Sequence, residues 1–266
     1  MSYHVLALYS FSPIDDPLDL RRHFRERCEA LEICGSLLFA SEGVNGTVAG
    51  SKEAISCLLE ELLCFFPSLR HQSSNSETKP FKRLILKLKS EIVTIGLTDV
   101  DPNERVGEYV LPSDWNRLIQ EEDIVLIDTR NDYEVQFGSF DGAIDPKTTS
   151  FRAFPDWVAQ NLDPKTHKRI AMYCTGGIRC EKASSYLLEQ GFETVYHLKG
   201  GILSYLRDVP KSDSLWQGDC FVFDRRISVS HGLEQGTQSH CEKCTFPMSE
   251  ADLLCSNCGH KRLIAN

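Results

Sequence analysis

Short apolar runs alternate with segments of helical spacing in the second half of the chain, and this rhythm restricts the fold more than any other feature. The runs occupy residues 125–127, 169–173 and 195–198, and a stretch suited to a helix follows each of them. Strands that alternate with helices form a parallel sheet, whose ligands bind beyond the carboxyl ends of the strands. We therefore predict an α/β domain over residues 113–215, and Cys174 stands directly after its second run.

The first ninety residues follow a different pattern, which indicates one small α+β unit. The order of elements is β-α-β-β-α-β, which is that of the ferredoxin-like (acylphosphatase-like) motif. We predict this domain over residues 1–90 and a linker without sustained periodicity over residues 91–112. The polar stretch at residues 73–76 is interpreted as a loop. The predicted strands cover residues 5–9, 37–40, 47–49 and 84–88, and the predicted helices cover residues 18–33 and 52–65.

Composition and charge place the chain among ordinary globular proteins. Of its 266 residues, 41% are hydrophobic and 25% are charged, and no apolar run approaches the roughly 20 residues that a bilayer span needs. The opening residues lack a basic segment, so we expect no signal peptide and a cytoplasmic protein. The net charge of −9 argues against a nucleic-acid partner, but residues 1–90 hold 11 basic and 11 acidic side chains, which leaves room for a basic face.

The stretch from Cys174 to Cys180 carries the clearest chemical signal. It lies between a predicted strand and a predicted helix, and its glycines let several backbone N–H groups point at one spot. A cysteine at the centre of such a loop is predicted to have a lowered pKa, with Arg179 adding a fixed positive charge. The alternative is a buried, inert cysteine followed by an ordinary turn. The residues predicted to form the anion cradle are Thr175, Gly176, Gly177 and Ile178.

This loop resembles the active-site loop of the rhodanese superfamily, in which four residues separate Cys from Arg. Residues 126–144 resemble the other signature of the superfamily, except that Ser139 and Phe140 stand where His and Ile are usual. Phosphatase relatives have one more residue between Cys and Arg, so the resemblance disfavours a phosphatase. It implies a supporting role in the site for Asp128, Arg130, Glu134 and Cys180.

Each supporting residue also has a simpler interpretation. The acidic and basic side chains could form a satisfied salt-bridge network with no direct catalytic role. Cys180 could resolve a persulfide or disulfide on Cys174, or it could be a packing residue.

Two Cys-x₂-Cys pairs near the end of the chain predict a metal site. Four thiolates at such spacing suit Zn²⁺, which prefers a closed tetrahedron of soft ligands. We predict a structural zinc in a ribbon-like C-terminal extension over residues 216–266; an iron centre, redox pairs or an empty site are the alternatives. The predicted ligands are Cys241, Cys244, Cys255 and Cys258.

Taken in order along the chain, these motifs resemble the bacterial oxygen-dependent tRNA uridine hydroxylase family. The resemblance rests on residues 41–47, 80–83, 87–93 and 220–229 together with the rhodanese core and the four cysteines. It implies hydroxylation of uridine 34, the wobble base, to 5-hydroxyuridine, with Cys174 as the active-site residue. The implied partners are the anticodon region of tRNA and molecular oxygen.

A cluster of positive charges near the end of the first domain is compatible with an RNA partner. Five basic side chains fall within eleven residues, and a strand would place two of them on one face. The alternative is a solvated edge strand that lysines protect from aggregation. The residues predicted to bind RNA are Lys79, Lys82, Arg83, Lys87 and Lys89.

Two other functions fit parts of the sequence. A sulfurtransferase could carry a persulfide on Cys174 and pass the sulfur to an acceptor, and a non-catalytic RNA-binding scaffold could use the fold for its shape alone. The sequence contains no flavin or nicotinamide fingerprint and does not identify a reductant.

Overall fold

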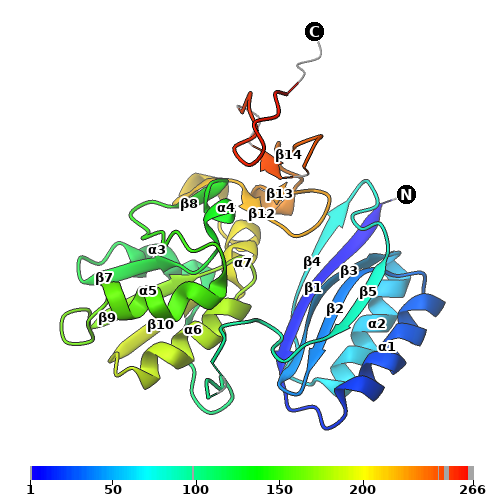
Figure 1. Cartoon of the computed structure of the whole chain (residues 1–266), viewed down its shortest axis with the longest axis horizontal. Helices are drawn as coiled ribbons and strands as arrows, with labels where there is room; N and C mark the ends of the chain where they lie inside the picture. The colour runs from blue at the N-terminus through cyan, green and yellow to red at the C-terminus, as the bar shows by residue number, and fades with distance from the viewer. Residues whose placement is uncertain (1, 98, 245, 249–251, 263–266) are drawn as a thin grey trace.

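The computed structural model describes residues 2–97, 99–244, 246–248 and 252–262. Figure 1 shows two α/β domains side by side, one in blue and cyan and the other mainly in green and yellow, with the C-terminal segment above them. The first has a largely antiparallel sheet and the second a parallel sheet. The predicted fold class is therefore confirmed.

Five strands and two helices make up the N-terminal domain. The sheet order is β4-β1-β3-β2-β5, in which β5 is parallel to β2 and every other neighbouring pair is antiparallel. Both helices cover one face of this sheet, and the other face is turned toward the second domain (Figure 1). The elements are β1 (Tyr3–Phe11), α1 (Pro17–Ala30), β2 (Cys34–Ala40), β3 (Gly43–Gly50), α2 (Lys52–Phe65), β4 (Arg70–Ser76) and β5 (Leu84–Leu88).

Side chains cap the first turns of α1 and α2. Asp16 accepts hydrogen bonds from the backbone N–H groups of Leu18 (3.0 Å) and Asp19 (2.9 Å), and Ser51 accepts one from Ala54 (3.1 Å). Such caps satisfy N–H groups that have no partner inside the helix. Between helices and sheet lies an apolar core that includes Leu6, Phe24, Leu37, Val48, Leu58 and Leu62.

The fourth strand of the ferredoxin-like order is not the predicted one. Residues 70–76, four of which were interpreted as a loop, form β4 at one edge of the sheet, and residues 84–88 form the additional strand β5 at the opposite edge. All seven side chains of β4 are polar, and the buried Gln72 donates a hydrogen bond to Ser204 of the second domain. A strand held by polar contacts lacks the apolar alternation that makes strands recognisable in a sequence.

The second domain is built around a four-stranded parallel sheet of order β6-β10-β9-β7. A short strand, β8, follows β7 and pairs outside this sheet. The strands are β6 (Glu108–Val110), β7 (Ile124–Asp128), β8 (Gly138–Phe140), β9 (Arg169–Tyr173) and β10 (Thr194–Leu198). The helices are α3 (Pro112–Ile119), α4 (Asp132–Val135), η1 (Phe151–Ala153), α5 (Phe154–Asn161), α6 (Ile178–Glu189) and α7 (Gly201–Asp208).

Part of the span predicted as a linker belongs to this domain. Residues 108–110 form β6 at the edge of its sheet, next to β10. Ile95 and Val100 are buried in a core cluster of the same domain. Their wide spacing and the Gly, Asp and Pro residues around them hide this packing from an analysis of periodicity.

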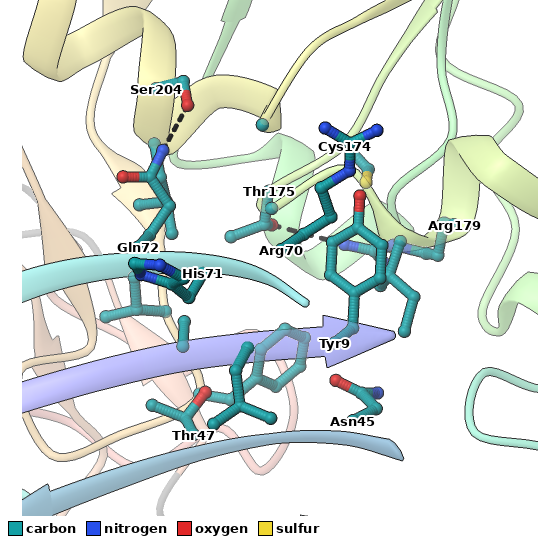
Figure 2. A pocket seen from close by; sticks show the side chains of 18 of the residues that line it. Tyr9, Asn45, Thr47, Arg70, His71, Gln72, Cys174, Thr175, Arg179 and Ser204 are labelled. Atoms are coloured by element: carbon teal, nitrogen blue, oxygen red, sulfur yellow. Dashed lines mark hydrogen bonds between the residues drawn. The ribbon is translucent and has the colours of Figure 1, made fainter. Parts of the chain in front are cut away.

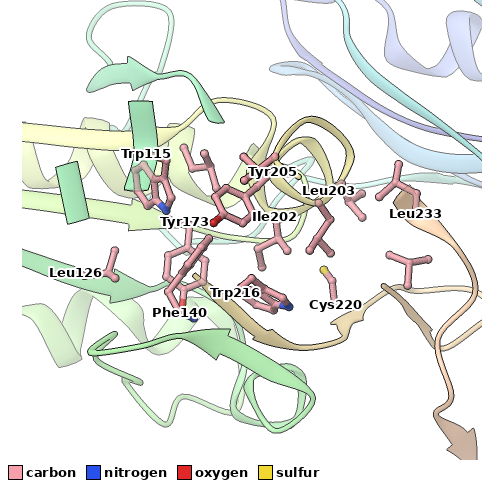
Figure 3. Close-up of a cluster of buried hydrophobic side chains, with 14 of the residues drawn as sticks. Trp115, Leu126, Phe140, Tyr173, Ile202, Leu203, Tyr205, Trp216, Cys220 and Leu233 are labelled. Carbon is pink, nitrogen blue, oxygen red and sulfur yellow. The ribbon is translucent and has the colours of Figure 1, made fainter. Parts of the chain in front are cut away.

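Aromatic residues fill the core on one side of the parallel sheet (Figure 3). The ring of Phe140, one of the two departures from the rhodanese signature, lies 4.9 Å from that of Tyr173, 4.8 Å from that of Tyr205 and 5.1 Å from that of Trp216. Trp216 belongs to the C-terminal segment. Phe140 therefore packs that segment against the core of the second domain.

The C-terminal segment begins as part of the second domain and then reaches the first. It comprises η2 (Lys211–Asp213), β11 (Trp216–Gly218), β12 (Cys220–Phe221), β13 (Ser228–Val229), η3 (His231–Leu233), β14 (Ser239–His240) and β15 (Pro247–Met248). Strand β11 pairs with β8, and Arg226 donates to Ser74 Oγ (2.7 Å) and to the Asn75 carbonyl (3.2 Å) of β4. Residues 263–266 of the predicted extension lie outside the described residues.

No helix within the described residues is long and apolar enough to cross a bilayer.

Candidate active site

The loop between β9 and α6 wraps around the sulfur of Cys174. Gly177, which precedes α6, has a φ of +100°, and its backbone N–H donates to Cys174 Sγ over 3.1 Å. At Gly201, the first residue of α7, a Cβ atom would lie 2.4 Å from the Cys174 carbonyl oxygen. Residues other than glycine would strain the first position and collide at the second, so these glycines let the backbone close around the cysteine.

The pKa of Cys174 is lowered from 9.0 to about 6. Burial of the side chain would by itself raise it, but a hydrogen bond from the Cys180 thiol, the charge of Arg179 and the backbone N–H groups of both residues stabilise the thiolate more strongly. A thiol with this pKa is mostly ionised at neutral pH, which agrees with the lowered pKa predicted from the loop. Burial and the neighbouring thiolate raise the pKa of Cys180 well above its usual range, so Cys180 stays protonated and donates.

Arg179 is held in place by Glu134 from the far side of the loop. The guanidinium makes two hydrogen bonds to this carboxylate, of 2.6 and 2.8 Å, and a third of 3.3 Å to Thr175 Oγ1. Burial opposes ionisation of Glu134, but the charge of Arg179 keeps the pKa of its carboxyl below the usual range. The paired guanidinium thus acts on Cys174 through its charge and fixed position.

Asp128 and Arg130 form a second ion pair, which is fully buried, with Nη2 and Oδ2 2.6 Å apart. Arg130 also donates to the carbonyl oxygens of Glu134 (3.2 Å) and Gly138 (2.6 Å), and its guanidinium lies 5.1 Å from the Trp216 ring. All of these contacts are with groups outside the cysteine loop. They favour the interpretation of this pair as a satisfied network that fixes the segment carrying Glu134.

A cavity of about 850 Å³ lies between the two domains, and Cys174 lines it. The other predicted site residues that line it are Thr175, Gly176, Ile178 and Arg179. The open face of the N-terminal sheet forms the opposite wall, so β1, β3 and β4 face the cysteine loop (Figure 2). The side chains labelled on this wall in Figure 2 are those of Tyr9, Asn45, Thr47, Arg70, His71 and Gln72.

Tyr9 links that wall to the helix that follows the cysteine loop. Its hydroxyl donates to Glu181 Oε1 (2.7 Å), and Tyr109 donates to the other oxygen of the same carboxylate (2.6 Å). A Cβ on Gly177 would lie 3.0 Å from the Tyr9 hydroxyl, so the ring lies directly over the loop. Burial and the charge of Glu181 raise the pKa of Tyr9, which therefore remains a hydrogen-bond donor.

The residues predicted to bind RNA lie outside this cavity. Strand register aligns Arg70, Tyr9, Asn45, Leu38 and Lys87 in one row across the open face of the sheet. Asn45 donates to the carbonyl oxygen of Ile92 (2.8 Å), so the segment after β5 interrupts this row. Exposed side chains are found at all five predicted positions, Lys79, Lys82, Arg83, Lys87 and Lys89.

Comparisons with known proteins agree along most of the chain. Residues 3–92 match the UPF0176 acylphosphatase like domain, and residues 111–208 match the rhodanese-like domain. A tRNA uridine(34) hydroxylase of Teredinibacter turnerae is 53% identical over 94% of this chain and 78% of its own length. Those of Acinetobacter baylyi (49% identical, 96% and 82% covered) and Acinetobacter baumannii (50%, 92% and 78%) are similar. The chain belongs to the tRNA uridine(34) hydroxylase family.

Rhodanese-like proteins of known structure match about two fifths of the chain. The rhodanese-like domain of an Anabaena protein is 19% identical, covers 42% of this chain and 80% of its own, and has a TM-score of 0.34. A rhodanese-like domain protein of Staphylococcus aureus is 20% identical, with 37% and 90% coverage and a TM-score of 0.31.

The four C-terminal cysteines come together as predicted for this family member. Their sulfur atoms all lie within 4.8 Å of one another, with Cys241 and Cys258 3.7 Å apart and Cys244 and Cys255 3.6 Å apart. A tetrahedron with zinc–sulfur bonds of about 2.3 Å has edges of about 3.8 Å, so the spacing fits a metal ion with four thiolate ligands.

The cavity wall contributed by the N-terminal domain was not predicted from the sequence. Tyr9 stands in an ordinary apolar strand, and Arg70 and Gln72 stand in a polar stretch that does not resemble a strand. One feature of the sequence could have indicated that this polar segment is longer than a short loop. Three consecutive polar residues, 70–72, directly precede the stretch interpreted as a loop.

Proposed function

We propose that this chain hydroxylates C5 of uridine 34 in tRNA, with the uracil ring bound in the cavity between the two domains and the Cys174 thiolate as the nucleophile. The family relationship, which spans more than nine-tenths of the chain, supports the reaction. The observation that carries the residue assignment is a thiolate of pKa about 6 in a cavity of about 850 Å³, which is large enough for a nucleotide.

A thiolate makes uracil reactive at the carbon that must be oxidised. Addition of sulfur to C6 forms a carbon–sulfur bond and moves the electron pair of the C5–C6 double bond to C5. Molecular oxygen then adds at C5, and one proton from water converts the resulting peroxide anion to a hydroperoxide. An external two-electron donor with two further protons cleaves its O–O bond, leaving a hydroxyl group and releasing water. Loss of the C5 proton expels the thiolate, restores the double bond and yields 5-hydroxyuridine.

The residues around Cys174 have distinct tasks in this scheme. The charge of Arg179, oriented by Glu134, keeps the sulfur ionised before attack and stabilises it again when it leaves. The protonated Cys180 is a positioning residue, because its thiol donates to the nucleophile. Tyr9 faces the uracil site from the opposite wall.

We propose the anticodon region of tRNA as the partner and the cytoplasm as the location of the protein. The exposed basic residues from Lys79 to Lys89 are proposed to contact phosphates away from the cavity. Zinc is the proposed ion of the four-cysteine site, because its preferred bond lengths fit the sulfur spacing. Bound there, zinc would stabilise the fold of the C-terminal segment; the site shares no residue with the cavity wall.

A sulfurtransferase carrying a persulfide on Cys174 is the second candidate. It is favoured by the hydrogen bond from Gly177 to the sulfur, which would also stabilise a terminal sulfur anion. This chemistry needs neither the wall of the N-terminal domain nor a nucleotide-sized cavity, so it accounts for less of the molecule.

Replacement of Cys174 tests the proposal. Cys174→Ser keeps the size of the side chain but does not ionise at neutral pH, so 5-hydroxyuridine formation should fall at least about a thousandfold, as expected for loss of a nucleophile. Mass spectrometry of tRNA nucleosides, after reaction of zinc-loaded protein with tRNA and oxygen, measures the product. Cys57→Ser, at an exposed cysteine on α2, is the matched control and should be fully active.

The same samples separate the two candidates. Wild-type protein that transfers sulfur from thiosulfate to cyanide but forms no 5-hydroxyuridine would favour the sulfurtransferase. A Cys174→Ser variant that hydroxylates uridine at the wild-type rate would exclude this residue as the nucleophile.

A further inference from the structure

The rim of the interdomain cavity carries an exposed aromatic ring. Phe223 lines the cavity, yet 59% of its surface is exposed, which makes it one of the two most exposed large apolar side chains among the described residues. The part of an aromatic ring that stays in water contributes little to folding, because the apolar surface that stabilises a fold is the part that is buried. A single exposed ring is common on protein surfaces, but this one lines the same cavity as Cys174.

The position of Phe223 is fixed by its neighbours. Its ring packs edge-on against Phe221 at 5.1 Å, and Phe221 stacks on Phe137 at 5.8 Å. The next residue in the chain, Asp224, forms a buried ion pair with Arg226, in which Oδ2 and Nη2 are 2.6 Å apart. Arg226 is itself hydrogen-bonded to β4. The ring therefore stands on a rigid support and loses little conformational freedom when a ligand packs on it.

Six Arg and Lys side chains line the same cavity, and three of them, Arg179, Arg207 and Arg226, are ion-paired. The other three stand apart from these pairs. Arg70 comes from the N-terminal sheet, Arg152 from η1 and Lys199 from the residue after β10, so they approach from different elements. All three are exposed, and none takes part in an ion pair among those found in the described part of the chain. The Arg70 guanidinium lies 4.9 Å from the Tyr109 ring, which holds it at the mouth of the cavity near Cys174 (Figure 2).

An exposed ring beside several unpaired cations suits one class of ligand. Proteins recognise RNA loops by stacking unpaired bases on aromatic side chains and by contacting phosphates with Arg and Lys. A uridine that enters the cavity must leave the stack of the anticodon loop, which exposes the faces of the bases on either side of it. An aromatic ring at the rim can then replace the lost stacking.

We propose that Phe223 stacks on a base directly adjacent to uridine 34, and that Arg70, Arg152 and Lys199 contact the phosphates that flank the target nucleotide. The inference rests on the proposed function for the identity of the RNA. Under this proposal the residues at the rim bind the anticodon loop specifically. Lys87 and Lys89 then make a more distant contact with the RNA.

Equilibrium binding of an anticodon stem-loop RNA to the zinc-loaded full chain tests this role. Loss of one base–aromatic stack costs about 1–3 kcal/mol, so Phe223→Ala should raise Kd about 5- to 150-fold, and Phe223→Trp should bind nearly as well as wild type. Phe65→Ala is the control, because Phe65 is 48% exposed but lies on α2, which covers the opposite face of the N-terminal sheet. It should leave Kd unchanged.

RNA with an abasic site identifies the stacking partner. If Phe223 stacks on base 33 or base 35, removing that base should weaken wild-type binding and leave no further loss for Phe223→Ala. Arg70→Gln should flatten the dependence of log Kd on log salt by about 0.7, the value for one phosphate contact in a single strand.

Failure of this inference can be told apart from failure of the proposed function. Phe223→Ala that binds as tightly as Phe65→Ala, or that loses the same factor with both abasic RNAs as with intact RNA, would overturn the stacking role even if the wild type makes 5-hydroxyuridine. Wild-type protein that makes none would overturn the proposed function, whatever the binding data show.

Discussion

The sulfur of Cys174 sits where burial alone would keep it protonated. Only 1% of the residue is exposed, and burial is the largest single influence on its pKa. The hydrogen bonds and charge that outweigh burial come from Arg179 and Cys180, which are neighbours in the sequence, and Gly177 also donates to the sulfur. The local loop therefore determines the ionisation state, and the sequence pattern was sufficient to predict it.

Ionisation of Cys174 should set the acid side of the pH profile. Because the pKa is lowered from 9.0 to about 6, the thiolate fraction rises through pH 6 and activity should fall below it. The same shift stabilises the folded chain: the contribution is complete above pH 9, shrinks as the pH falls, and is lost as the pH passes below 6. The thiolate absorbance at 240 nm, taken as wild type minus Cys174→Ser, measures the pKa directly.

The expected difference spectrum has a single step near pH 6. A step near pH 9 would mean that the loop does not stabilise the thiolate, and the charge assigned to the nucleophile would be wrong.

At the scale of elements, prediction succeeded where apolar periodicity is strong. The helix at residues 52–65 has the predicted bounds, and the strands at residues 169–173 and 195–198 lie where the apolar runs indicated. It failed at β4, whose side chains are all polar because their partners belong to another domain. The wall formed by the N-terminal sheet was not predicted for the same reason. Contacts between segments that are distant in the sequence produce no periodic pattern in either segment.

Two lysines at the end of β5, Lys87 in the strand and Lys89 just after it, provide a test at the same scale. Lys87 and Lys89 are exposed at the sheet edge opposite β4, so their replacement by Gln should leave the cavity intact. If both contact phosphates, the double variant should bind all tRNAs more weakly and lose about 1.4 units of salt slope, or 0.7 for each contact. The control is the pair Arg22→Gln and Lys52→Gln, two exposed cations on the helix-covered side.

Binding measurements over a range of salt concentrations decide between the two interpretations of this strand. A slope equal to that of the wild type would identify the lysines as a solvated edge, and the rim cations would then account for the RNA contacts. Thiolate formation at Cys174 should be the same in all of these variants.

At the scale of the whole molecule, three parts of the chain that are distant in sequence share one cavity. The N-terminal sheet and the cysteine loop form its walls, and residues 222–233 of the C-terminal segment contribute to its rim. Arg226 joins these parts, because it pairs with Asp224 and also donates to Ser74 and Asn75 of β4. The rim therefore keeps its shape only while this segment is held against the first domain.

Loss of the Arg226 contacts should separate the cavity walls without unfolding either domain. Arg226→Gln leaves the buried Asp224 without its partner, which costs about 3–5 kcal/mol, and removes the hydrogen bonds between the C-terminal segment and β4. We expect calorimetry to resolve two thermal transitions in place of one, and the KM for tRNA to rise at least about tenfold, because Phe223 loses its support. Arg225→Gln is the matched control, since this neighbouring side chain is exposed, and it should behave as wild type. A single unchanged transition with normal KM in Arg226→Gln would mean that the domains hold the cavity together through Tyr9, Gln72 and Glu181 alone.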